Sequence, residues 1–266
     1  MSASASSAAS RAMDDGFECT VAAYATVDAP LESIPALREN PGSASSPPLP
    51  PRFLRYADEQ TVVGLVAVLR AMALAPMRGT DFTHWGVLAA PRFQGRLSGA
   101  ATLKKFAQLG PAAVSPHAIP QSSLHAISSA ISVALGMHGP NFGIGGGPEA
   151  LDEGLIVAVT YVQGARVPGM WLVLTQWDTE PFPDGNGGST TPVNCCAAAL
   201  ALVPRVRGGA CLRMSSSRSH HPGMGLTAWL TARAAAGEAG IWSRPLTWGG
   251  QIEFVLDEQV QQRKAA

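Results

Sequence analysis

The chain has 266 residues, of which 46% are hydrophobic and only 14% are charged, and its 19 basic side chains balance its 19 acidic ones. A neutral chain has no long-range field that attracts phosphates or anionic lipids, which argues against nucleic-acid and membrane-surface partners. Typical domains carry about 25% charged residues, so small polar groups or another protein must cover this surface.

Residues 1–16 are mostly Ser and Ala and lack the apolar core of a signal peptide, so we expect a disordered tail and a cytoplasmic protein. No run approaches the roughly 18 apolar residues of a membrane span. The four cysteines form no CxxC pair, which indicates neither a disulfide framework nor a zinc site. We expect no metal and no cofactor.

The first half of the chain alternates between apolar runs and breaks. Residues 19–27 form a short run with β-branched side chains, which predicts a buried strand. Residues 41–51 are rich in Pro and Ser and predict an extended loop. Residues 58–75 have apolar side chains almost all round a helix, which predicts a deeply buried helix. Residues 85–90 predict a second strand.

The middle of the chain predicts a strand, a sharp turn and a helix. A short helix over residues 101–109 and a Pro-rich loop come first, and Ser122 or Ser123 then caps a helix that Gly136 ends. A strand follows over residues 138–144. Gly145, Gly146 and Gly147 make the turn, and Pro148 and Glu149 begin a helix that runs to about Gln163.

Three further strands and a helix are predicted in the last third of the chain. The strands cover residues 170–177, 193–203 and 251–256, and the helix covers residues 226–236. Strands that alternate with helices imply a layered α/β domain.

A turn between a strand and a helix is a common place for a nucleophile, because it exposes the side chain and the helix start stabilises negative charge. Here the turn holds only glycines and Pro148, and none of these side chains can attack a substrate. A phosphate site is disfavoured too, because Glu149, Asp152 and Glu153 would repel the anion and the glycine pattern matches no nucleotide fingerprint.

Other candidate residues have simple structural explanations. His117, His125 and the pair His220–His221 lack the spacing of a metal site. Cys195 and Cys196 lie in an apolar strand, where a thiol is usually an inert hydrophobe. A nucleophilic role for either thiol stays open as an alternative.

The run from Ser115 to Ala158 contains Leu135-Gly136 at a helix end and Gly139-Pro140 at a strand start, in an order that resembles the amino-terminal half of β-ketoacyl synthases. The resemblance covers roughly residues 17–203. It implies the thiolase-like fold: a truncated α/β structure with a layered mixed sheet and helices on both faces. We expect residues 17–205 to form this domain and residues 206–266 to be a carboxy-terminal extension that closes it.

The chain departs from the family where the chemistry takes place. Counted from Gly139-Pro140, the position of the family's catalytic cysteine falls on Pro148, so the turn of Gly147, Pro148 and Glu149 has no nucleophile. The family's two catalytic histidines come from a second half that this chain is too short to contain. Condensation needs a thioester on cysteine and histidines for the malonyl group, so we expect no catalytic residue here.

The resemblance implies a non-catalytic subunit, similar to chain-length-factor-like partners in aryl polyene, polyketide or fatty-acid pathways. Its partners would be an active β-ketoacyl synthase and an acyl carrier protein. Two alternatives remain: a cysteine-dependent acyltransferase or hydrolase, and a homodimeric protein that binds an acyl chain or an acyl carrier protein.

In dimers of this family, the strand after Gly-Pro pairs with its counterpart across the two-fold axis. The resemblance therefore implies that Gly139, Pro140, Phe142 and Ile144 lie at an interface beside the partner's acyl pocket. Phe142 would help cap that pocket and limit chain length by its volume. We expect this strand to account for part of the weakly charged surface.

Overall fold

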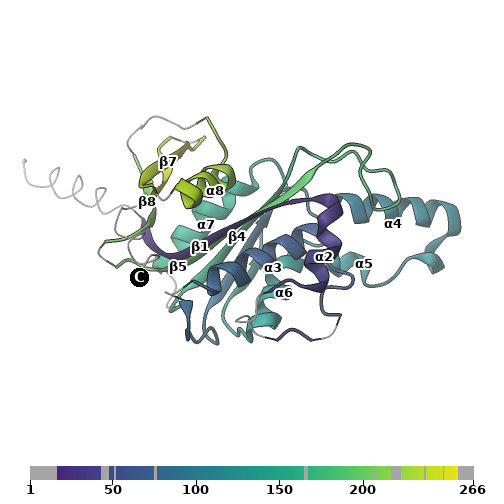
Figure 1. The fold of residues 1–266 in the computed structure, drawn as a ribbon, viewed down its shortest axis with the longest axis horizontal. Coiled ribbons are helices and arrows are strands. Elements are labelled where there is room, and N and C mark those ends of the chain that lie inside the picture. The colour runs from purple at the N-terminus through teal and green to yellow at the C-terminus, as the bar shows by residue number, and fades with distance from the viewer. Residues whose placement is uncertain are drawn as a thin grey trace, which may run out of the picture.

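A mixed sheet of eight strands forms the centre of the molecule, in the order β3-β2-β4-β5-β1-β6-β8-β7 (Figure 1). The computed structural model describes residues 17–42, 48–50, 52–74, 77–164, 167–206, 208–216, 223–236, 238–247 and 249–256. The expected tail at residues 1–16 lies outside the described residues. Strands β3, β2 and β4 are parallel, and every other neighbouring pair is antiparallel.

The elements follow one another along the chain with short connections. The strands are β1 (Glu18–Pro30), β2 (Gly86–Pro91), β3 (Asn141–Gly143), β4 (Met170–Asp178), β5 (Asn194–Pro204), β6 (Cys211–Ser215), β7 (Gly240–Pro245) and β8 (Gln251–Leu256). The helices are α2 (Ile34–Glu39), α3 (Glu59–Met72), α4 (Arg96–Leu109), α5 (Ala118–Gln121), α6 (Ala126–Leu135), α7 (Ala150–Gly164) and α8 (Leu226–Ala236). Short 3₁₀ turns cover Leu31–Ser33 and Pro111–Ala113.

Helices cover both faces of the sheet, as predicted. Helices α3 and α6 pack with one face in a first hydrophobic cluster, and α7 and α8 pack with the other face in a second cluster. Strand β5 separates the two clusters: Ala197, Ala199 and Ala201 face α3, whereas Leu200 and Leu202 face α7. Burial on both faces explains why this strand is apolar without a break.

Most predicted elements are present, and four details were wrong or missed. The sequence gave no signal for β6, β7 or α2, which are short and carry several polar residues. Helix α6 begins at Ala126 rather than at the predicted serines. Ser122 instead ends α5, and the Ser123 hydroxyl donates to the Pro120 carbonyl over 2.8 Å.

Close backbone contacts fix β3 in place. A Cβ atom at Gly143 would overlap the Leu124 carbonyl, and one at Gly139 would overlap the Trp85 carbonyl. Glycine is therefore required at both positions for the strand to lie against its neighbours. The predicted strand over residues 138–144 is confirmed in place, although only Asn141–Gly143 pair with β2.

Helices α4 and α5 project from one end of the sheet, at the right of Figure 1. Leu97 is the only described residue of α4 that is buried. Leu103, Phe106 and Leu109 are 70%, 50% and 66% exposed and recur every three residues, so they share one face of the helix. The projection therefore presents an apolar face that the described residues leave uncovered.

Candidate functional site

The glycine turn lies at the carboxyl end of the parallel strands. Gly145 and Gly146 have φ values of 82° and 92°, a left-handed conformation that side chains disfavour. The Gly146 amide donates to the Pro91 carbonyl over 3.0 Å, and the Phe93 amide donates to the Gly146 carbonyl over 3.2 Å. These bonds attach the turn to the end of β2, where α/β proteins commonly place ligands.

The turn contains no nucleophile. Pro148 and Glu149 are exposed, and α7 begins after them, at Ala150 rather than at the predicted Pro148. Gly147 is half-buried, and a Cβ atom there would meet nothing within 4 Å. The geometry thus keeps the shape of a nucleophile turn without a group that can attack.

The two strand cysteines are poor nucleophiles. Cys195 is fully buried, and burial raises the pKa of its thiol well above the usual range. Burial also raises the pKa of Cys196 to about 12, with a further contribution from the Asp28 carboxylate, to which its thiol donates over 3.5 Å. Both groups are therefore protonated thiols at neutral pH, which disfavours the cysteine-dependent alternative.

A buried glutamine supports the loop that holds the turn. The fully buried Gln60 amide donates to the carbonyls of Arg92 and Phe93 over 2.9 and 3.2 Å, and its oxygen accepts from the Thr175 hydroxyl over 2.6 Å. Phe93 has a φ of 55°, which is rare for a bulky side chain. The sequence analysis missed Gln60, because a polar residue at the start of a helix reads as a solvent-facing position.

A buried carboxyl group adjoins this glutamine. Asp58 caps α3 through the Gln60 amide, and it also accepts from Gln94 over 3.1 Å and from Ser98 over 3.4 Å. Burial, followed by the neighbouring Glu59 carboxylate, raises the pKa of Asp58 to about 8. The network connects the base of α4 with the loop that supports the glycine turn.

The carboxy-terminal segment reaches the turn as well. Arg244 of β7 forms an ion pair with Asp152 of α7 and lies 3.8 Å from Glu149. Beside this contact is a cavity of about 210 Å³, bounded by Arg92, Pro148 and the first turn of α8. Residues after 205 therefore add strands to the same sheet and cover the turn. The predicted domain boundary at residue 205 itself stays a prediction.

The predicted interface residues lie at an open sheet edge. Strand β3 pairs with β2 on one side and has no strand on its other side among the described residues. The Phe142 ring contacts the Tyr161 ring edge-on at 5.1 Å, and both Phe142 and Ile144 are half-buried. Gly139 and Pro140 precede the strand, and the Pro140 carbonyl accepts from the Val87 amide over 2.8 Å.

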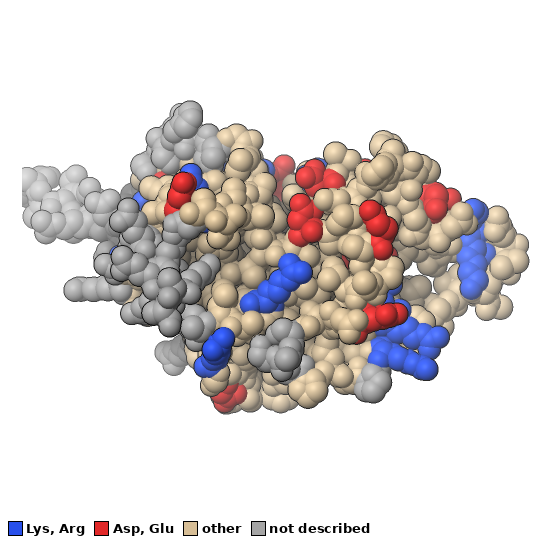
Figure 2. Space-filling view, viewed as in Figure 1, with Lys and Arg blue, Asp and Glu red and all other residues tan. Residues whose placement is uncertain are grey.

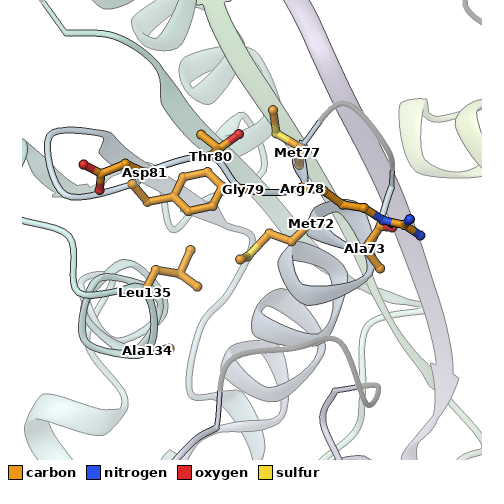
Figure 3. A pocket seen from close by; sticks show the side chains of 10 residues that line it. Met72, Ala73, Met77, Arg78, Gly79, Thr80, Asp81, Ala134 and Leu135 are labelled. Atoms are coloured by element: carbon orange, nitrogen blue, oxygen red, sulfur yellow. The ribbon is translucent and has the colours of Figure 1, made fainter.

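A larger hollow of about 610 Å³ lies elsewhere, between the ends of α3 and α6 (Figure 3). Met72, Met77 and Leu135 line it, at the amino end of β2, opposite the glycine turn. None of the polar network reaches this hollow, so it is not part of the candidate site.

No cluster of three or more metal-ligating side chains occurs among the described residues. His125 caps α6, with its Nδ1 3.2 Å from the Ser128 hydroxyl, whereas His220 and His221 lie outside the described part of the chain. No described helix is long and apolar enough to cross a membrane. Charged groups are sparse on the face in Figure 2, in keeping with the composition.

Comparison with solved structures identifies the fold. One match, with a TM-score of 0.56 and 16% identity, belongs to the ketosynthase ApeO in complex with its chain length factor ApeC from Xenorhabdus doucetiae, and it covers 89% of this chain and 99% of that chain. The fold is that of the ketosynthases. This confirms the predicted thiolase-like fold, and the near-complete coverage shows that a chain of similar length adopts it.

Two further ketosynthase-fold structures match at a TM-score of 0.51. The ishigamide ketosynthase/chain length factor shares 17% identity and covers 84% of this chain and 72% of that chain. A type II PKS acyl-carrier protein in complex with its ketosynthase bound to the hexaketide, AntDE:AntF, shares 15% identity and covers 71% and 62%. No protein-family model and no curated protein matches the chain.

Proposed function

We propose that this chain is a non-catalytic subunit of the chain-length-factor type that pairs with an active ketosynthase during polyketide or fatty-acid chain elongation. Two of the similar structures are complexes of a ketosynthase with a chain length factor, which supports a subunit of this kind. The turn that would hold the nucleophile carries Pro148, and the thiols of β5 are buried and protonated, which supports a role without catalysis.

The observation that carries the proposal is the open edge of β3. An unpaired edge strand exposes backbone donors and acceptors, which proteins normally protect or pair with another chain. Phe142 and Ile144 flank this edge as half-buried apolar side chains, suited to become fully buried on pairing. The exposed apolar face of α4 offers a second contact area.

The partner's acyl chain would be delivered by an acyl carrier protein, as a substrate of the paired enzyme rather than of this chain. A carrier protein occurs in one of the similar complexes, which supports this part of the proposal. We place the pair in the cytoplasm, where the sequence analysis expects this chain.

Co-expression with a ketosynthase encoded nearby, followed by native mass spectrometry, tests the pairing. We expect a one-to-one complex that Phe142→Asp weakens by about a hundredfold or more, because an unpaired charge would be buried at the interface. Ile241→Asp is the matched control: Ile241 is 52% exposed on β7, the opposite edge strand. This variant should leave the complex intact.

A stable monomer in the presence of the ketosynthase would contradict the proposal, as would equal complex formation by the Phe142→Asp variant. Because Phe142 also packs on Tyr161, thermal unfolding must show that the variant folds. Ile144→Asp provides a second test on the same edge. A homodimer that ignores every ketosynthase would instead favour the homodimeric acyl-binding alternative.

A further inference from the structure

The cavity beside the glycine turn has a donor-rich lining that pairing does not explain. Its volume of about 210 Å³ lies between the carboxyl ends of β2 and β4 and the first turns of α7 and α8. A water molecule occupies about 30 Å³ of liquid, so this space corresponds to roughly seven waters or to an organic molecule of similar size.

Two guanidinium groups border the cavity, and both keep donors free. Arg92 contacts Glu180 through Nε, at 3.3 Å from a carboxylate oxygen. Arg244 uses Nε for Asp152 and lies 3.8 Å from Glu149 through one terminal nitrogen. A guanidinium has five N–H donors, so each arginine can bind a further acceptor without losing its present partner.

The first turns of two helices add positive partial charge. The cavity is lined by Pro148 and Leu151 at the start of α7 and by Leu226 and Thr227 at the start of α8. The first amides of a helix have no acceptor within the helix, and the helix dipole places positive potential there. The acids near the arginines balance the guanidinium charge, so these helix ends leave the cavity electropositive.

A buried hydroxyl in the cavity has no partner. Thr227 is 8% exposed and lines the cavity, and its side chain makes no hydrogen bond with any described residue. The Gln176 amide, which lines the same cavity, also has no partner among the described residues. Buried polar groups normally have a partner, so this pair of side chains indicates a missing ligand.

We propose that this cavity binds a short-chain monocarboxylate. The carboxylate lies among Arg92, Arg244 and the Thr227 hydroxyl, because these supply the uncommitted donors. Its hydrocarbon end contacts Leu151 and Leu174, the apolar part of the lining. One negative charge matches the excess from the helix ends. The site needs no nucleophile and adds to this chain a ligand that the proposed pairing does not require.

Isothermal titration of the purified chain with butyrate tests the proposal, with butyramide and inorganic phosphate as comparison ligands. We expect saturable butyrate binding and at least tenfold weaker binding of both comparison ligands, because butyramide lacks the charge and phosphate lacks the apolar end. Thr227→Val should weaken butyrate at least tenfold, since it removes a hydrogen bond to a charged group. Thr160→Val, on the exposed side of α7, is the matched control and should bind as the wild type.

Absence of saturable butyrate binding would overturn the proposal, as would equal binding of butyramide or phosphate. Wild-type affinity in Thr227→Val would overturn it as well. Where Thr227→Val fails to fold, Gln176→Leu tests the same cavity, with the same expected loss. Phe142→Asp should bind butyrate as the wild type does, so failure of the pairing and failure of this site give separate results.

Discussion

Replacement of Gln60 by Leu tests the support of the glycine turn. The substitution keeps the volume of the side chain but removes three hydrogen bonds, to the Arg92 carbonyl, the Phe93 carbonyl and the Thr175 hydroxyl. Each bond contributes about 1 kcal/mol, and the Thr175 hydroxyl, only 3% exposed, loses its partner inside the core. We expect a loss of about 3–5 kcal/mol in the free energy of unfolding.

Urea denaturation followed by tryptophan fluorescence measures this loss. Gln60→Leu combined with Thr175→Val should recover about 1 kcal/mol or more, because the second change removes the unpaired hydroxyl. Gln108→Leu, at an exposed position of α4, should stay within about 0.5 kcal/mol of the wild type. A Gln60→Leu protein within about 1 kcal/mol of the wild type, or a double variant without recovery, would refute the reasoning.

Three further predictions concern the same region. Cys195 and Cys196 should resist iodoacetamide in the native protein at pH 7 and react in urea; rapid native labelling would show that the thiols are accessible. Gly146→Ala should cost about 1–3 kcal/mol in urea denaturation, because its φ is 92°, whereas Gly147→Ala should cost less than about 1 kcal/mol. Because burial raises the pKa of Asp58 to about 8, the folded chain binds this proton more tightly than the unfolded chain does. Stability should therefore fall as pH rises from about 4 to about 8, by up to about 1.4 kcal/mol per pH unit, and Asp58→Asn should flatten that slope.

The sequence predicted the central elements because their signals are strong and local. Helix α3 and strands β4 and β5 are apolar on every side, and burial on every side is what the structure shows. The missed strands β6 and β7 lie towards the outer edge of the sheet, where short segments carry polar residues such as Arg213 and Arg244. Their pairing depends on partners far away in the sequence, which local patterns do not reveal.

The candidate site was predicted only in part, for a similar reason. The glycine turn and the edge strand follow from adjacent residues, so their positions were read from the sequence correctly. Gln60 and Arg244 reach the turn from positions about 85 residues before it and almost 100 residues after it, and only the folded chain brings them there. The three short contacts of Gln60 and the ion pair of Arg244 with Asp152 therefore required the structure.

The tight backbone contacts around β3 bear on how relatives of this chain can be found. With 15–17% identity to the similar structures, overall sequence similarity is a weak guide. Gly139 and Gly143 tolerate no side chain, because the Trp85 and Leu124 carbonyls occupy the space. A search that requires these two glycines at their spacing, followed by a turn without cysteine, would separate candidate silent subunits from active enzymes by steric necessity rather than by overall similarity.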